Sequence, residues 1–316
     1  MRLIVATSLG LLGLLAPLAW GGNWAHNQNF IVLAEERSLA ESVLAQADRY
    51  RRQLAQEWLG EELPPSVGRT IITVTLSESV DRGFTWPIDG PERRYHKMWL
   101  TGSRMQLLGS TLEHEMTHVV LATRFPGMLP AWADEGAASL KDDAARREAC
   151  RRLIAWYART GNWPDLRSLF QQEAIVAEDR AAYSVAGSVT SYLLSRGDKA
   201  TFLAFALAGP REGWDAALRS CYGLESVEQL QGAWQAWVER SGAGADRSGP
   251  RALSSGGPAP KRAGFVAAGK RPTWSSLPAN RAPKGRLVAS PEQHLGMEVG
   301  PWRPAEPRPD PRASSR

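Results

Sequence analysis

Residues 105–124 read MQLLGSTLEHEMTHVVLATR, and from this stretch onward the chain changes from mixed to helical sequence patterns. Apolar residues recur through it at three- and four-residue steps until a Pro-Gly pair, so the pattern predicts one helix over the whole stretch. His114 and His118 lie four residues apart and therefore on the same helical face. Two imidazoles so placed can bind one zinc ion, whereas Glu115 is turned aside, where it can act as a base toward a metal-bound water.

A second segment supplies the third ligand that a catalytic zinc site needs besides an open position. Residues 129–138 read LPAWADEGAA, and sixteen residues lie between His118 and Glu135. This length allows the motif helix to end, a turn, and a return helix over residues 131–141 that presents Glu135 to the metal. We therefore expect Glu135 to be the third ligand, with Asp134 as the alternative ligand and an ordinary exposed acid as the alternative role of Glu135.

These two motifs carry a resemblance to a known family. Residues 114–138 (HEMTHVVLATRFPGMLPAWADEGAA) look like the gluzincin clan of metallopeptidases. More narrowly, they resemble the peptidase MA-like family, whose pattern is HExxH followed by Pro-x-Trp-x-x-Glu-Gly. On the matching positions, the resemblance implies that His114, His118 and Glu135 are zinc ligands and that Glu115 is the general base. A weaker similarity in layout extends over residues 28–240.

Three further expectations concern residues around this site. Related gluzincins use a tyrosine to stabilise the oxyanion of the tetrahedral intermediate, and the resemblance implies this role for Tyr183, with a core or surface tyrosine as the alternative. Thermolysin-like enzymes carry an Asp four residues after the ligand Glu, which orients a zinc His. This chain has Ser139 there, so the sequence leaves that partner unidentified. Residues 95–101 are expected to form the edge strand that pairs with an extended peptide, with His96 structural rather than a ligand.

The remaining sequence predicts an α+β fold. Strands are expected at residues 29–33, 69–76 and 95–101 and around residues 84–86, and a long amphipathic helix at residues 35–59. Beyond the motif helix, helices are expected at residues 131–141, 142–160, 165–173, 179–196, 198–208, 211–222 and 225–240. This order predicts a small mixed sheet in the first half, packed on a mainly helical, zincin-like second half.

The two ends of the chain differ in composition from the middle. A basic Arg2, an apolar run over residues 3–20 and a small-residue cleavage site predict a signal peptide over residues 1–21 and an exported, secreted or periplasmic protein. An uncleaved membrane anchor is the alternative. Residues 241–316 contain 12 Pro and 10 Gly without apolar periodicity, so they are expected to be a disordered tail. The metallopeptidase domain is then expected to span residues 22–240.

The charge distribution argues against a nucleic-acid-binding fold. The formal net charge of +5 comes from the tail, which has 13 Lys and Arg against 5 Asp and Glu, a net of +8; residues 1–240 have 25 and 28, a net of −3. No nucleic-acid partner is therefore expected, although the basic tail can contact an anionic cell-envelope surface. The two cysteines, Cys150 and Cys221, either form one disulfide in an oxidising compartment or remain two buried thiols.

Together these features predict an exported zinc metallopeptidase with Zn²⁺ as its cofactor. It would hydrolyse peptide bonds in a peptide or protein substrate by a zinc-activated water, with Glu115 as general base. One alternative is a zinc-binding but catalytically silent envelope domain that acts as a binding module, which the missing Asp at position 139 favours. A second alternative is a structural scaffold whose Pro-rich tail is the working part.

Overall fold

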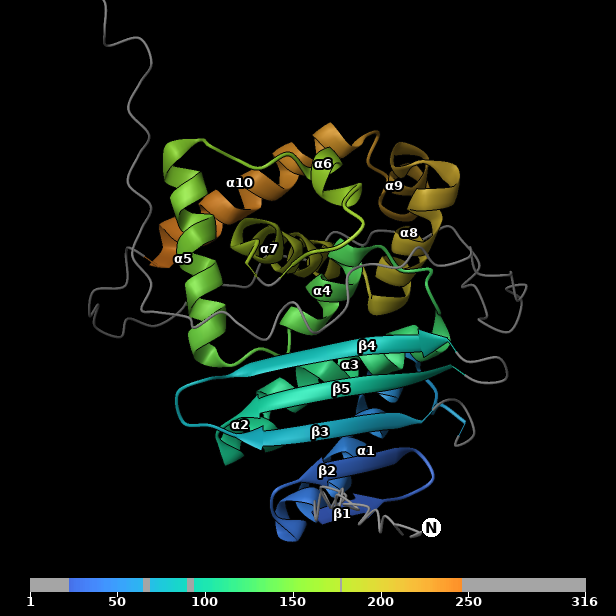
Figure 1. Ribbon diagram of the computed structural model, residues 1–316. Coiled ribbons are helices and arrows are strands. Elements are labelled where there is room, and N and C mark those ends of the chain that lie inside the picture. Colours follow the sequence, from blue (N-terminus) through green and yellow to red (C-terminus); the bar gives the residue numbers. More distant parts are fainter. Residues whose placement is uncertain (1–22, 65–68, 90–93, 177, 246–316) are drawn as a thin grey trace, which may run out of the picture. The chain divides into compact units, whose positions relative to one another are not determined.

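The computed structural model describes residues 23–64, 69–89, 94–176 and 178–245. They form an α+β fold with a five-stranded mixed sheet in the first half and helices in the second, which confirms the predicted fold class (Figure 1). The predicted signal peptide and the tail beyond residue 245 lie outside the described residues. The last helix, α10 (Val227–Ala245), continues five residues past the expected domain end at residue 240. Among the described residues, no helix is long and apolar enough to cross a membrane.

The sheet has the strand order β1-β2-β3-β5-β4. Its strands are β1 (Asn23–His26), β2 (Phe30–Ala34), β3 (Thr70–Leu76), β4 (Arg82–Asp89) and β5 (Arg94–Gly102). The pairs β2–β3 and β3–β5 are parallel, and the outer pairs β1–β2 and β4–β5 are antiparallel. The predicted strands are thus confirmed, and β1 is an addition to them.

One prediction about the sheet is wrong. The strand predicted over residues 95–101 was expected at the edge, but β5 is hydrogen-bonded to β3 on one side and to β4 on the other. The edge strand next to the motif helix is β4, which was expected only around residues 84–86. The hairpin carries the chain from the edge back into the sheet, where β5 buries side chains on its inward face; Met98 and Leu100 are at most 1% exposed.

Helices cover one face of this sheet (Figure 1). The first, α1 (Arg37–Leu59), connects the parallel strands β2 and β3 and packs on the sheet through the apolar stripe predicted from sequence. It ends at Gly60, whose φ of 74° lies in the left-handed region that glycine adopts without a steric cost. The buried apolar residues of α1 are Leu39, Ala40, Val43, Ala47, Leu54, Ala55, Trp58 and Leu59.

The single helix predicted over residues 105–124 is two helices. The first, α2 (Arg104–Leu108), begins at Ser103, which forms a capping box with Gln106. At Gly109 the backbone leaves the helical region, and a Cβ there would lie 2.8 Å from the carbonyl oxygen of Met105. The motif helix, α3 (Ser110–Arg124), therefore begins at Ser110. Apolar periodicity continues through this break, which is why sequence alone predicted one element.

The described part of the second half consists of helices, four of which begin with the same type of N-terminal cap. They are α4 (Ala131–Ser139), α5 (Ala144–Thr160), α6 (Leu166–Phe170), α7 (Arg180–Arg196), α8 (Lys199–Glu212), α9 (Trp214–Tyr222) and α10. Four of them begin with an aspartate whose carboxylate accepts a hydrogen bond from a backbone N–H three residues on, a strong N-terminal cap. The capping residues are Asp143, Asp165, Asp179 and Asp198. The break expected at residues 209–210 lies instead at Gly213, because α8 continues through Pro210.

Two packing features fix α4 against the rest of the helical half. Trp132 is fully buried and stacks on Phe170 with ring centroids 4.4 Å apart. At Gly136, a Cβ would lie 2.1 Å from Thr190 Oγ1 and 2.8 Å from the carbonyl oxygen of Ala186, so only glycine permits this approach of α4 to α7. Because α4 carries Glu135 and Asp134, this contact sets where both carboxylates lie.

The two cysteines lie on separate helices, Cys150 on α5 and Cys221 on α9, and both are free thiols. Burial raises the pKa of each. Of the two states left open by the sequence, the structure has unpaired, half-buried thiols.

Candidate metal centre

The three residues expected as ligands converge on one point between α3 and α4. His114 Nε2 lies 3.2 Å from His118 Nε2. The carboxylate oxygens of Glu135 lie 3.9 Å from His114 Nε2 and 3.9 Å from His118 Nε2. One ligand atom from each residue falls within 4.8 Å of the others, so the group can bind a metal ion. The four-residue spacing of the histidines on α3 brings both imidazoles to this point. The chain then returns in α4, which brings the carboxylate of Glu135 to the same point.

The side of His114 that faces away from Glu135 is held by Asp142, in the turn after α4. His114 Nδ1 lies 3.0 Å from Asp142 Oδ1. Since an ionised carboxylate only accepts hydrogen bonds, Nδ1 carries the proton and Nε2 presents its lone pair. Asp142 is almost completely buried, with 1% of its side chain exposed. A hydrogen-bonded carboxylate in this position fixes both the tautomer and the ring orientation of a metal-binding histidine.

His118 has an equivalent partner. Its Nδ1 lies 2.9 Å from Asp134 Oδ2, so this ring also directs Nε2 toward Glu135. Asp134 was the alternative ligand, but it contacts the opposite nitrogen of His118 and is outside the converging group. Each histidine therefore has a carboxylate partner, which the sequence had left unidentified.

Ser139, at the position where thermolysin-like enzymes carry their orienting Asp, has a different contact. Its hydroxyl donates to the carbonyl oxygen of Gly136. Asp142 lies three residues further on and reaches His114 because α4 ends at Ser139 and the chain turns back toward α3. No sequence signal distinguishes Asp142 from Asp143, since only the turn decides which of them faces inward.

Tyr183, on the first turn of α7, joins the same arrangement. Its hydroxyl donates to Asp142 Oδ2 at 2.7 Å, and its ring is stacked near that of His114 with centroids 6.3 Å apart. Burial, together with the charge of Asp142, raises the pKa of Tyr183 well above its usual range, so the phenol stays protonated. Asp142 thus links the tyrosine to His114, one of the two histidines of the converging group.

The charges at the site are closely coupled. Burial lowers the pKa of His118, but the negative charges of Asp134, Glu135 and Glu115 outweigh this effect and raise it to about 10. Burial raises the pKa of Glu135, and the two histidines offset part of that rise. The excess of carboxylates over histidines is the electrostatic environment that favours a bound cation.

Glu115 is close to the converging group but does not belong to it. It is 4% exposed, and its Oε2 accepts a hydrogen bond of 2.6 Å from Thr85 Oγ1 on the edge strand β4. The strand approaches so closely that a Cβ on Gly83 would lie 2.3 Å from Glu115 Oε1. Gly83 and Thr85 could not be assigned to the site from the sequence, because only the strand order brings β4 to α3.

A network of polar side chains anchors the start of β4 to the helices. Asp81 accepts from Thr111 Oγ1 at 2.6 Å on α3 and pairs with Arg146 at 2.8 Å on α5. Arg146 also lies 3.9 Å from Asp142 Oδ1. The network therefore connects the edge strand, the motif helix and the carboxylate of Asp142 through the guanidinium of Arg146. His96, expected to be structural, is buried on β5 and lies outside the converging group.

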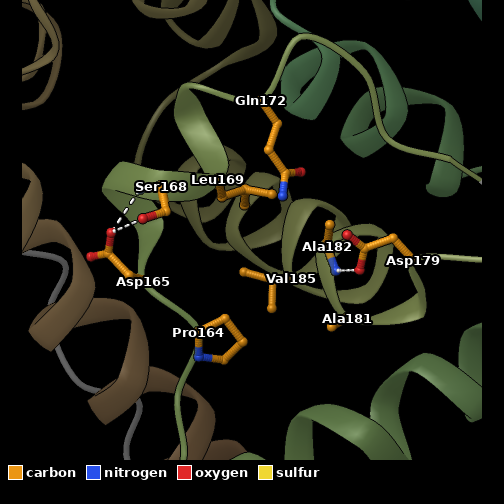
Figure 2. Close-up of a pocket in the computed structure, with 9 residues that line it drawn as sticks. All are labelled: Pro164, Asp165, Ser168, Leu169, Gln172, Asp179, Ala181, Ala182 and Val185. Atoms are coloured by element: carbon orange, nitrogen blue, oxygen red, sulfur yellow. Dashed lines mark hydrogen bonds between the residues drawn. The ribbon is translucent and has the colours of Figure 1, made fainter.

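A separate pocket of about 150 Å³ lies between α6 and the start of α7 (Figure 2). Leu169 and Val185 give it an apolar wall. Asp165 and Asp179 at its rim already accept hydrogen bonds as helix caps, which Figure 2 draws as dashed lines. It is lined by none of the residues of the converging group.

Comparison with protein-family models gives no match for this chain. Comparison with curated proteins gives none either. The geometry of the site and the two motifs are therefore the features that point to a function.

Proposed function

We propose that the chain is a zinc-dependent metallopeptidase of gluzincin type, similar to the peptidase MA-like family, that hydrolyses peptide bonds. The observation that carries this proposal is the convergence of two imidazole nitrogens and one carboxylate from two helices, with Glu115 beside them but outside the ligand group. This is the division of roles that the HExxH motif requires.

The ligand set favours zinc and a catalytic site. Two imidazoles and one carboxylate are a zinc donor set, and three protein ligands rather than four leave one coordination position for water or substrate. Zinc held by His114, His118 and Glu135 would polarise the scissile carbonyl and lower the pKa of a bound water. Asp142 and Asp134 would keep both Nε2 atoms directed toward the metal.

The remaining chemistry belongs to side chains of this protein. Glu115 takes the proton of the attacking water and gives it to the leaving amine. Thr85 holds the Glu115 carboxylate through one oxygen, which leaves the other oxygen for the proton. Tyr183 is our proposed donor to the oxyanion of the tetrahedral intermediate, a role that requires its hydroxyl to exchange Asp142 for substrate.

An extended peptide would bind along the outer edge of β4. We propose β4 for this role in place of β5, because β4 is the edge strand of the sheet among the described residues and lies next to Glu115. Main-chain groups of an edge strand can pair with an extended substrate. Pro87 has no N–H to donate, so it limits the length of such a pairing. Export of the protein remains a proposal from its N-terminal sequence.

The test is a set of three variants assayed for bound zinc and for chelator-sensitive cleavage of a peptide library. Glu115→Gln should retain zinc and lose hydrolysis, because only the base is removed. His114→Ala should lose zinc, measured by elemental analysis of the purified protein. Glu113→Gln, two residues away on the same helix, is the matched control and should keep both properties. Hydrolysis by Glu115→Gln at the wild-type rate would exclude the mechanism.

The alternative function, a catalytically silent zinc-binding module, was favoured by the absence of an aspartate at position 139 that could orient a histidine. Asp142 and Asp134 contact the two histidines from other positions, so this absence no longer favours the alternative. Zinc binding by the wild-type chain without cleavage of any library member would restore this alternative.

A further inference from the structure

The face of the sheet opposite the helices has an unusual composition. Figure 1 shows α1 and α3 behind the sheet, with no labelled element over its other face. A sheet with one open face normally alternates apolar residues inside and polar residues outside. Here most of the outward strand positions are apolar as well. The aromatic residues at these positions are Trp24, Phe84, Trp86, Tyr95 and Trp99.

Strand register places three of these rings side by side. Phe84 is directly opposite Trp99 across β4 and β5, and paired residues point to the same face. The ring of Phe84 stacks near Trp99 at 5.8 Å and near Trp86 at 6.0 Å between centroids. Two of the aromatic side chains are exposed, one at each edge of the sheet. Trp24 on β1 is 55% exposed, and Phe84 on β4 is 41% exposed. A cluster of partly exposed aromatic side chains such as Phe84, Trp86 and Trp99 is typical of an interaction site.

The charges on the same face have one sign. The charged Arg and Lys side chains at outward strand positions are Arg82 and Lys97, and no acidic residue occupies a described outward position. Neither has an ion-pair partner among the described residues. Two copies of the chain meeting through this face would bring like charges together without an acid to offset them, which disfavours self-association.

We propose that this open face docks on an anionic lipid bilayer. Tryptophan and tyrosine favour the membrane–water interface, and lysine and arginine beside them are attracted to anionic headgroups. Trp24 of β1 lies on the same face of the sheet. Because α3 packs on the opposite face, docking leaves the metal centre and the outer edge of β4 free for substrate.

The first test measures whether the face contacts lipid. The full chain, with Cys150 and Cys221 replaced by serine, carries one new cysteine labelled with an environment-sensitive dye. Thr73→Cys reports from the middle of the open face, and Thr160→Cys on α5 is the control. Vesicles of phosphatidylcholine and phosphatidylglycerol should shift the emission of the Thr73 label to the blue and leave the Thr160 label unchanged. Protein that binds the vesicles without a blue shift of the Thr73 label would overturn the proposal. The same emission shift in the absence of vesicles would also overturn it, because that result indicates self-association.

The second test measures what the charged and aromatic groups contribute. Lys97→Glu should weaken binding to the anionic vesicles by about fivefold or more, the effect expected for one basic residue at such a surface. Arg159→Glu, an exposed site on α5, is its control. Phe84→Thr should weaken binding, whereas Trp156→Thr, 42% exposed on α5, should not. Equal binding of all four variants to the vesicles would refute the docking surface. Glu115→Gln should bind the vesicles as the wild type does, so the test is independent of catalysis.

Discussion

Replacing Asp142 by asparagine removes a charge from the candidate metal centre while keeping the shape of the side chain. The aspartate is buried and accepts two hydrogen bonds, from His114 Nδ1 at 3.0 Å and from the Tyr183 hydroxyl at 2.7 Å. Asparagine has one acceptor oxygen. If that oxygen faces His114, the ligand keeps its tautomer but exchanges a charge-assisted hydrogen bond for a neutral one, which costs about 1 kcal/mol. If the amide faces His114 instead, the proton moves to Nε2, the nitrogen that faces the converging group.

The expected result is a tenfold to hundredfold weaker zinc affinity, or about 1.4–2.7 kcal/mol, the range for a lost carboxylate partner of a zinc histidine. Competition with a chromophoric chelator at neutral pH measures it. Asp143→Asn is the matched control, because Asp143 caps α5 and asparagine caps equally well. Thermal unfolding of the metal-free proteins separates a local effect from misfolding. Zinc affinity of a folded Asp142→Asn within twofold of the wild type would refute the role of this carboxylate.

Three further predictions follow from other contacts. Gly136→Ala should lower the free energy of unfolding by about 1–3 kcal/mol, seen as a lower melting temperature, because the added methyl group overlaps α7. Gly232→Ala is the control on α10, where a Cβ meets nothing within 4 Å. It should raise the free energy of unfolding by about 0.5–1 kcal/mol. Thr85→Val should lower kcat by about tenfold at unchanged zinc content, and Thr85→Ser should restore most of it, since the hydroxyl that donates to Glu115 returns. Burial raises the pKa of Glu57, but hydrogen bonds and ion pairs with two lysines outweigh burial and lower this pKa below 4.5. The loss of stability in Glu57→Gln should therefore be largest at neutral pH and shrink as the pH falls below 4.5, as measured by denaturant titrations.

Each of these has an outcome that contradicts it. An unchanged melting temperature in Gly136→Ala would show that α4 and α7 are not in close contact. Wild-type turnover by Thr85→Val would remove Thr85 from the positioning of Glu115. The sign of the pH effect follows from the lowered pKa: the ionised form is favoured in the folded state, so its stabilisation is lost as the pH falls and Glu57 takes up a proton. A difference that grows toward low pH would contradict the ion pairs of Glu57 with Lys141 and Lys199.

The sequence by itself determined the features that depend on local geometry. The spacing of His114 and His118 fixes their common face wherever the helix forms, because residues four apart are neighbours on any α-helix. Glu135 could be predicted as the third residue of the group because a short turn and a return helix leave few other places for it. The fold class followed from the change between strand and helix periodicity.

Tertiary structure alone decided which distant residues meet. Asp142 faces His114, and its neighbour Asp143 caps α5, because of the turn after α4; the two are indistinguishable as letters. Strand order decided that β4, and not β5, lies against Glu115. Strand pairing and the packing of α4 on α7 are set by contacts between residues far apart in the chain, and such contacts have no period in the sequence from which to predict them.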